Sequence, residues 1–283
     1  MADRRTGGQA VRVRRLLIGA ALALTLPSVA LAQQAPNVRF LVYTKNGQGY
    51  VHENIPFAVR GLQRLGAELH MTVDTSSDPT VFTEANLRRY AFLVFANTNN
   101  DVFDNDAQRL VFRRYIEAGG GMIGIHSVLG TERNWTWFKQ LMGGTFNWHA
   151  VYQPFRVRRI DAAHASVQGV PDDWRKSDEF YFVKEMYPGI QVILASDIRS
   201  LGPQDSAHIR EAQYPFADYY PSAWTHEFDG GFAWITTLGH DGGDYENPIY
   251  SGLLRGALRY AATRARPLDY RRAYATSRDT PLP

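Results

Sequence analysis

The chain has 283 residues, 45% of them hydrophobic and 21% charged, so it is long and apolar enough to form a folded core. This composition excludes a disordered chain, a collagen and a coiled coil. Because the chain has no cysteine, disulfides, zinc–thiolate sites and thiol nucleophiles are excluded. Residues 1–32 hold five arginines and one aspartate, which leaves residues 33–283 at −1 out of a net charge of +3. The charge therefore does not favour nucleic-acid binding.

The first 32 residues have the layout of a bacterial secretory signal peptide. An arginine-rich start is followed by an apolar run, Leu16–Leu26, and by the small-residue motif Ala30-Leu31-Ala32. The run has about half of the ~20 residues that a spanning helix needs, so we expect no stable membrane anchor. We expect cleavage near Ala32-Gln33 and an exported protein, periplasmic or extracellular. The pair Arg14-Arg15 leaves both the general and the twin-arginine export routes open.

Residues 38–125 alternate between apolar runs and amphipathic segments. Strands are expected at Val38–Thr44, Leu69–Val73, Ala91–Ala96 and Met122–Ile125. Helices are expected at Ile55–Leu65, at Thr83–Arg89 with Thr83 as N-cap, and from a cap at Asp104 to about Ala118. This alternation predicts right-handed βαβ units and a parallel sheet, with ligands at the carboxyl ends of its strands.

The pattern changes beyond residue 145, where strand-like runs are separated by turns. The runs are Val151–Ile160, Phe180–Val183, Val192–Ala195, Ala223–His226 and Phe232–Thr237, and Leu253–Ala262 is expected to be a closing helix. No repeat or linker divides residues 33–263, which predicts one α/β domain with a β-rich second half. Residues 264–283 contain five arginines, two aspartates and three prolines and are interpreted as a solvated tail.

Several dispersed segments resemble the ThuA-like (trehalose-utilisation) family. Gly119–Ser127 (GGGMIGIHS) resembles its glycine-rich segment ending in Gly-x-His, and Val42–Ile55 resembles its first strand and histidine-bearing loop. Ser177–Tyr181 looks like its DEwY segment, and Ala223–Glu227 with Thr237–His240 looks like aWtHE…tlGH. The resemblance covers about residues 38–262. Several motifs in the right order make it specific.

The resemblance implies a flavodoxin-like three-layer α/β/α sandwich with a mainly parallel sheet, similar to class I glutamine amidotransferases. In those enzymes the elbow after the fourth strand carries a nucleophilic cysteine, and a later histidine is its base. Here these two positions hold His126 and His240. Without cysteine, thiolate glutaminase chemistry is excluded, so a shared fold does not mean a shared function.

The candidate catalytic residues are His126, His240, Asp178 and Glu179. A strand-to-helix elbow would present His126 to the site, as in a nucleophile elbow. Asp178 and Glu179 are adjacent, so side-chain alternation should send only one of them into the site, to accept a proton or to orient a histidine.

Six further residues are predicted to bind substrate: His52, Glu132, Trp148, His149, His226 and Glu227. They follow strand ends, the elbow or a glycine-bearing loop, and a tryptophan beside a histidine suits stacking on a sugar face. At least three of the histidines at positions 52, 126, 149, 226 and 240 are expected to line one pocket at the carboxyl edge of the sheet.

Histidines and acids at strand ends fit general acid–base catalysis, and they also fit a divalent-metal site. No H-x-x-x-H or H-E-x-x-H pair is present, so the spacing is no evidence for a metal, and no other cofactor is predicted. The resemblance implies a carbohydrate partner: a sugar or keto-sugar that is isomerised, cleaved by elimination or hydrolysed. A non-catalytic sugar-binding protein and a metal-dependent hydrolase remain the alternatives, and the sequence decides neither the sugar nor the oligomeric state.

Overall fold

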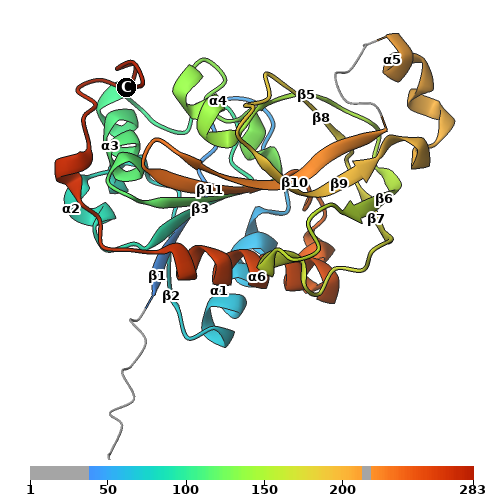
Figure 1. Cartoon of the computed structure of the whole chain (residues 1–283), viewed down its shortest axis with the longest axis horizontal. Helices are drawn as coiled ribbons and strands as arrows, with labels where there is room; N and C mark the ends of the chain where they lie inside the picture. Colours follow the sequence, from blue (N-terminus) through green and yellow to red (C-terminus); the bar gives the residue numbers. More distant parts are fainter. Residues whose placement is uncertain (1–37, 212–217) are drawn as a thin grey trace, which may run out of the picture. The chain divides into compact units, whose positions relative to one another are not determined.

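The computed structural model describes residues 38–211 and 218–283 (Figure 1). The predicted signal peptide, residues 1–32, lies outside the described residues, so it stays a prediction. None of the helices in the described part has the length and apolar character that a membrane crossing requires.

One nine-stranded sheet runs through the described residues in the order β2-β1-β3-β4-β11-β10-β9-β6-β7 (Figure 1). Its parallel half consists of β1 (Arg39–Tyr43), β2 (Thr72–Ser76), β3 (Phe92–Ala96), β4 (Gly121–Ile125) and β11 (Gly231–Thr236). Its antiparallel half consists of β6 (Gln153–Arg159), β7 (Trp174–Asp178), β9 (Gln191–Asp197) and β10 (Tyr219–Phe228). A separate antiparallel pair joins β5 (Thr145–His149) to β8 (Tyr181–Lys184).

Helices cover both faces of the sheet (Figure 1). One face carries α1 (Ile55–Glu68) and α6 (Pro248–Arg264), and the other carries α2 (Glu84–Leu87), α3 (Asp106–Glu117) and α4 (Thr136–Met142). The short helix α5 (Ser206–Glu211) follows β9. Neighbouring residues of β3 belong to the two hydrophobic cores on opposite faces of the sheet: Val94 packs towards α1 and α6, and Phe95 packs towards α3 and α4. The predicted three-layer α/β/α fold with a β-rich second half is therefore confirmed.

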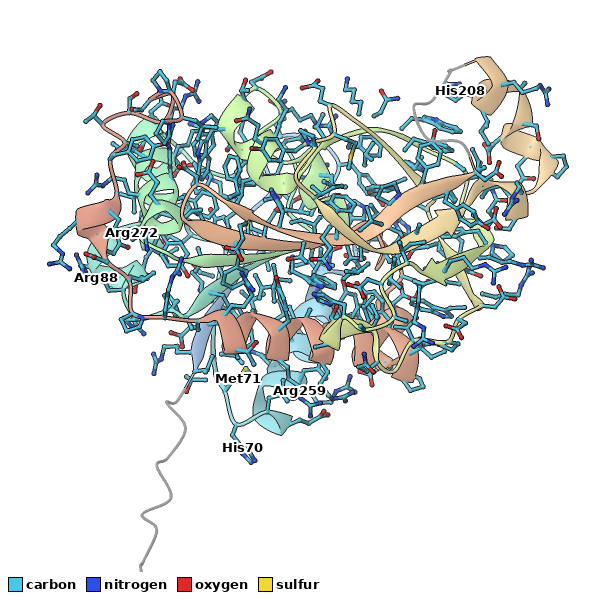
Figure 2. The ribbon with its side chains drawn as sticks, viewed as in Figure 1. His70, Met71, Arg88, His208, Arg259 and Arg272 are labelled. Atoms are coloured by element: carbon cyan, nitrogen blue, oxygen red, sulfur yellow. The ribbon has the colours of Figure 1, made fainter. Side chains whose placement is uncertain are left out.

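Several predicted boundaries are wrong, and two of them have a clear local reason. The second strand begins at Thr72 instead of Leu69, because α1 continues to Glu68 and the chain turns at exposed His70, whose φ is 56° (Figure 2). Helix α3 is capped by Asn105, whose side chain accepts the Gln108 N–H at 3.0 Å, whereas Asp104 pairs with Lys45. The predicted cap at Thr83 is confirmed, since its hydroxyl accepts the Asn86 N–H.

Residues 264–283 are mostly exposed, as their composition predicts, but they do not form a free tail. Arg113 on α3 is fully buried and donates to the carbonyl groups of Arg278 and Thr280 at 2.9 and 2.5 Å. Glu117, also buried on α3, accepts the Ala275 N–H at 3.1 Å. Because buried charged groups need hydrogen-bond partners, the C-terminal segment packs on α3 and supplies the partners of these two side chains.

Candidate functional site

His126 occupies an elbow immediately after β4. Its φ is 53° and its side chain is fully buried. A left-handed backbone is uncommon outside glycine and concentrates at functional turns. Nδ1 lies 2.8 Å from the carbonyl oxygen of Thr237, which can only accept, so Nδ1 carries the proton. In the neutral ring Nε2 therefore has a lone pair free to accept.

Three side chains from other parts of the chain converge on His126 Nε2. His52 Nε2 lies at 3.1 Å, His240 Nδ1 at 3.3 Å and Glu179 Oε2 at 3.4 Å. These four residues form the histidine–glutamate cluster, and one nitrogen or oxygen atom of each lies within 4.8 Å of those of the others. The hydroxyl of Tyr181 is also 3.1 Å from His126 Nε2.

Loops at the ends of three strands supply the partners of His126. His52 lies between β1 and α1, Glu179 directly follows β7, and His240 lies after β11. The rule that ligands bind beyond the carboxyl ends of parallel strands accounts for His52, His126 and His240.

Asp178 holds the loop that carries His240. Its fully buried carboxylate accepts the N–H groups of Gly239 at 2.8 Å and His240 at 3.3 Å, and it pairs with Lys176 at 3.0 Å. Gly239 has a φ of 116°, and a Cβ at this position would lie 2.1 Å from the hydroxyl oxygen of Tyr250. As the alternation predicts, only one acid of the pair, Glu179, enters the site, while Asp178 positions the loop.

Burial and mutual contact set the charges of the cluster. Burial, followed by the charges of His126 and His240, lowers the pKa of His52 to about 3. Burial alone would raise the pKa of Glu179, but its contacts with the rings of His126 and His240 hold it well below its ordinary value. The hydrogen bond to Glu179 raises the pKa of His240. At neutral pH Glu179 is therefore an anion and His52 is neutral.

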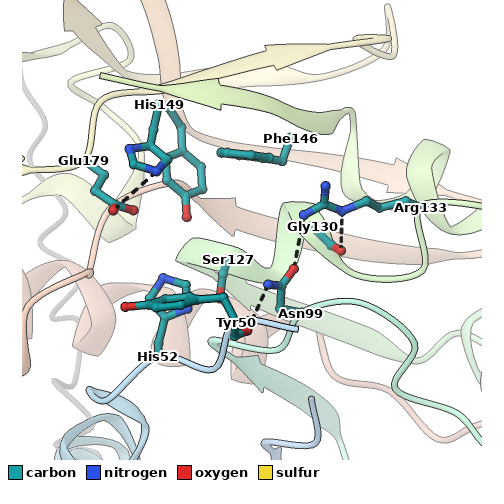
Figure 3. A pocket seen from close by; sticks show the side chains of 10 residues that line it. Tyr50, His52, Asn99, Ser127, Gly130, Arg133, Phe146, His149 and Glu179 are labelled. Atoms are coloured by element: carbon teal, nitrogen blue, oxygen red, sulfur yellow. Dashed lines mark hydrogen bonds and ion pairs between the residues drawn. The ribbon is translucent and has the colours of Figure 1, made fainter. Parts of the chain in front are cut away.

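The cluster borders a pocket of about 360 Å³ (Figure 3). The residues that line the pocket are Tyr50, His52, Asn99, Ser127, Gly130, Arg133, Phe146, His149, Glu179 and Tyr181. His149 Nε2 lies 3.5 Å from Glu179 Oε1. The rings of Phe146 and Tyr181 lie 4.8 Å apart in the wall, which gives the pocket an apolar surface suited to the C–H face of a sugar.

Comparisons with known proteins identify the family. A family model described as ThuA, trehalose utilisation, matches residues 39–261. The chain belongs to the ThuA family. No curated protein matches it. The family's description points to a carbohydrate-related role.

Solved structures show the same fold for this ThuA-family protein. A ThuA-like protein from Bacteroides uniformis is 20% identical with a TM-score of 0.64, over 84% of this chain and 96% of that one. Another, from Parabacteroides merdae, is 18% identical with a TM-score of 0.60, over 80% and 90%. A β-galactosidase from Rahnella is 11% identical with a TM-score of 0.51, over 79% of this chain but only 31% of that enzyme. At these identities the likeness shows the fold alone.

Four of the five histidines singled out in the sequence gather around Glu179. Only His52 and His149 line the pocket itself, so the prediction that at least three would line one pocket is wrong. His52, His126 and His240 belong to the cluster, and His149 contacts Glu179 from the pocket wall. His226 is buried elsewhere, with Nε2 2.7 Å from the Leu141 carbonyl and its ring beside Phe228. Its prediction as a substrate-binding residue is wrong, because its place on β10 directs it into the core beneath α4.

Three other predicted substrate-binding residues lie outside the pocket. Trp148 neighbours His149 on β5 and packs on Phe182 and His208 instead, since adjacent strand residues point to opposite faces. Glu227 is exposed and pairs with Arg264. Glu132 is buried 2.7 Å from Arg109 and accepts the Val102 N–H at 2.9 Å.

Sequence reasoning missed seven of the ten pocket residues, among them Tyr181, Ser127 and Arg133. Tyr181 lies two positions after Glu179, a spacing that could have placed both on one side of an extended segment. Ser127 follows the elbow directly, so its neighbour His126 was a signal for it. Arg133 had no signal, because the loop conformation alone brings it to the pocket.

The histidine–glutamate cluster fits a divalent metal. Three imidazole nitrogens and a carboxylate oxygen are donors that zinc and other first-row metals accept. The Nδ1–H bond of His126 to a backbone carbonyl is the outer contact that orients metal-binding histidines. The four residues could therefore hold such an ion as well as exchange protons.

Proposed function

We propose that this ThuA-family protein is a carbohydrate-acting enzyme in which the histidine–glutamate cluster transfers protons at a sugar or keto-sugar. The observation that carries the proposal is the convergence of His240 Nδ1 and Glu179 Oε2 on His126 Nε2 beside an aromatic-walled pocket. The description of the family as trehalose utilisation supports a carbohydrate substrate.

His126 is suited to act as a general base. The Thr237 carbonyl holds the Nδ1 proton, so Nε2 is the atom that accepts a proton. Because His126 is buried behind the pocket wall, the proton reaches Nε2 from the substrate through His52 or Glu179, which line the pocket and contact Nε2. The imidazolium that results is stabilised by the Glu179 carboxylate, as a triad aspartate stabilises its histidine. A carbonyl group makes a neighbouring C–H acidic enough for such a base, which favours a keto-sugar.

His240 is suited to return the proton. Its Nδ1 lies 3.2 Å from Glu179 Oε2, and this contact favours the protonated ring. Delivery of a proton to a neighbouring carbon completes an isomerisation, and delivery to the glycosidic oxygen completes an elimination; addition of water to the resulting double bond makes the net reaction a hydrolysis. The proton left on His126 passes to His240 across their 3.3 Å contact, which restores both rings. Glu179 links the two histidines, so removing its charge would weaken both steps.

A metal-dependent hydrolase is the second candidate, and the crowding at His126 Nε2 favours it. Once Nδ1 is protonated, Nε2 has one lone pair, yet His52, His240 and Glu179 all approach it to within 3.4 Å. A cation among these atoms would satisfy the lone pairs together. A bound ion would polarise a substrate oxygen as a Lewis acid.

We also propose that the enzyme works outside the cytoplasm. The order of arginines, apolar run and small-residue motif in residues 1–32 supports removal of the signal peptide near Ala32-Gln33. An exported enzyme of this kind would meet sugars before they are taken up.

One experiment separates these functions. The purified mature protein is incubated with disaccharides and their keto derivatives, and products are identified by mass spectrometry. Metal content is measured on the same sample, and the assay is repeated after chelation. Turnover that survives metal removal supports proton transfer by the cluster alone. Turnover lost on chelation and restored by a divalent ion supports the hydrolase, and binding without turnover supports a sugar-binding protein.

A further inference from the structure

Arg133 is an exposed residue that lies in the wall of the pocket and is positioned there by hydrogen bonds (Figure 3). Its Nε–H donates to the Gly130 carbonyl at 2.9 Å, and one terminal N–H donates to Asn99 Oδ1 at 3.3 Å. The guanidinium also lies over the ring of Phe146, 5.4 Å from its centre. All these partners are uncharged, and no carboxylate among the described residues forms an ion pair with Arg133. Its positive charge is therefore available to a ligand.

The loop around Arg133 is built to present this side chain. The preceding residue, Glu132, has a left-handed φ of 49°, and its buried carboxylate accepts from Arg109 at 2.7 and 3.2 Å. A Cβ at Gly130 would lie 2.4 Å from Asn99 Oδ1 and 2.8 Å from a terminal nitrogen of Arg133. An arginine that only served solubility would need none of these constraints.

A hydroxyl group without a hydrogen-bond partner lines the same pocket. Ser127 is only 4% exposed, and its hydroxyl oxygen has no hydrogen-bond partner. A buried hydroxyl left unpaired costs about 1–3 kcal/mol, so a ligand that accepts its proton gains affinity. Figure 3 places Arg133 and Glu179 on opposite sides of the pocket, so an anionic ligand group beside Arg133 avoids the glutamate.

We propose that the substrate is a sugar acid whose carboxylate binds Arg133 and Ser127 while the histidine–glutamate cluster acts on the rest of the molecule. The proposal rests on the proposed function of this site and names its substrate class. A planar guanidinium matches a carboxylate in shape and charge, and charge-assisted hydrogen bonds are about twice as strong as neutral ones. Arg133 is then the residue that selects acids over neutral sugars.

Calorimetry with matched ligands tests the proposal. D-Glucuronate, D-galacturonate and D-gluconate are each compared with the corresponding uncharged amide, which keeps the shape and removes the charge. At least one acid should bind the wild type about 10- to 100-fold more tightly than its amide, as expected for one charge-assisted hydrogen bond in a pocket. Arg133→Gln should remove this preference. Arg133→Lys should retain part of it, because an ammonium keeps the charge without the planar fork.

Arg259→Gln is the control variant. It makes the same change of charge at an exposed residue of α6, on the face of the sheet opposite α3 and α4 (Figure 2). It should bind acids and amides as the wild type does. A melting curve for each variant shows that all of them are folded.

Three results would overturn the proposal: no binding by any of the acids, equal affinity for acids and amides, or an unchanged preference in Arg133→Gln. Failure of the proposed function gives a different outcome. If acids bind through Arg133 but no carbohydrate is turned over, the carboxylate site stands and catalysis is refuted. If neutral keto-sugars are turned over equally by wild type and Arg133→Gln, catalysis stands and the carboxylate site is refuted.

Discussion

Replacing His126 by asparagine removes the imidazole at the centre of the cluster while keeping the local backbone. Asparagine accepts the left-handed conformation that His126 has, with its φ of 53°, more readily than most residues. Its side-chain N–H can donate to the Thr237 carbonyl, which now accepts from Nδ1 at 2.8 Å. His126→Asn therefore tests the chemistry of Nε2 with little disturbance of the fold.

The two roles of His126 predict opposite magnitudes. If Nε2 transfers a proton, its loss lowers turnover by about 10²- to 10⁴-fold. The melting temperature then changes little, because the buried carbonyl keeps a donor. If the contacts of Nε2 with His52, His240 and Tyr181 serve only to hold the fold together, their loss lowers stability by about 1–3 kcal/mol even though the Thr237 bond is kept, which is several degrees for a domain of this size. Activity per folded molecule would then be unchanged.

The assay measures turnover and thermal unfolding on the same preparation. Turnover is followed by mass spectrometry on a sugar that the wild type converts. His226→Gln is the matched control, because His226 is also buried and bonded to a backbone carbonyl but lies outside the pocket. It should keep wild-type turnover. Equal turnover by His126→Asn and the wild type would refute the catalytic assignment.

Three further predictions concern stability and export. Burial lowers the pKa of His226 below its unfolded value of about 6.5, so below that pH the native state binds fewer protons than the unfolded state. The free energy of unfolding therefore has its full value above pH 6.5 and falls on acidification by at most about 1.4 kcal/mol per pH unit. Urea unfolding at pH 7.5 and 5.5 should show a smaller acid loss in His226→Gln, and an identical loss would contradict the burial argument. Gly239→Ala should cost about 2–4 kcal/mol in urea unfolding, because φ is 116° and the new Cβ meets Tyr250; a wild-type unfolding midpoint would count against this geometry. N-terminal sequencing of protein from an extracytoplasmic fraction should give Gln33 or a residue close to it, whereas intact Met1 on cytoplasmic protein would exclude export.

The sequence by itself determined the layered α/β fold and most of the cluster. The apolar run Ala91–Ala96 and the helical spacing of Ile55–Leu65 are local patterns in the sequence. Both correctly predict the elements that form there, β3 and α1. Once a parallel sheet is expected, the strand-end rule selects His52, His126 and His240. This rule needs only the order of elements along the chain, so it works before any contact is known.

Only the tertiary structure decided which polar groups face the pocket and what each one contacts. His126 is oriented by the Thr237 carbonyl, 111 positions away in the chain. Arg133 is placed in the pocket by the loop that the buried Glu132–Arg109 ion pair holds and by its own bond to Gly130. The sequence predicts His226 at the end of a strand, as for a site residue, yet β10 continues to Phe228 and His226 lies under α4. Side-chain direction depends on strand pairing and on packing between distant segments. Composition and residue spacing contain no information on strand pairing or on packing between distant segments. The sequence therefore predicts the cluster but not the complete pocket.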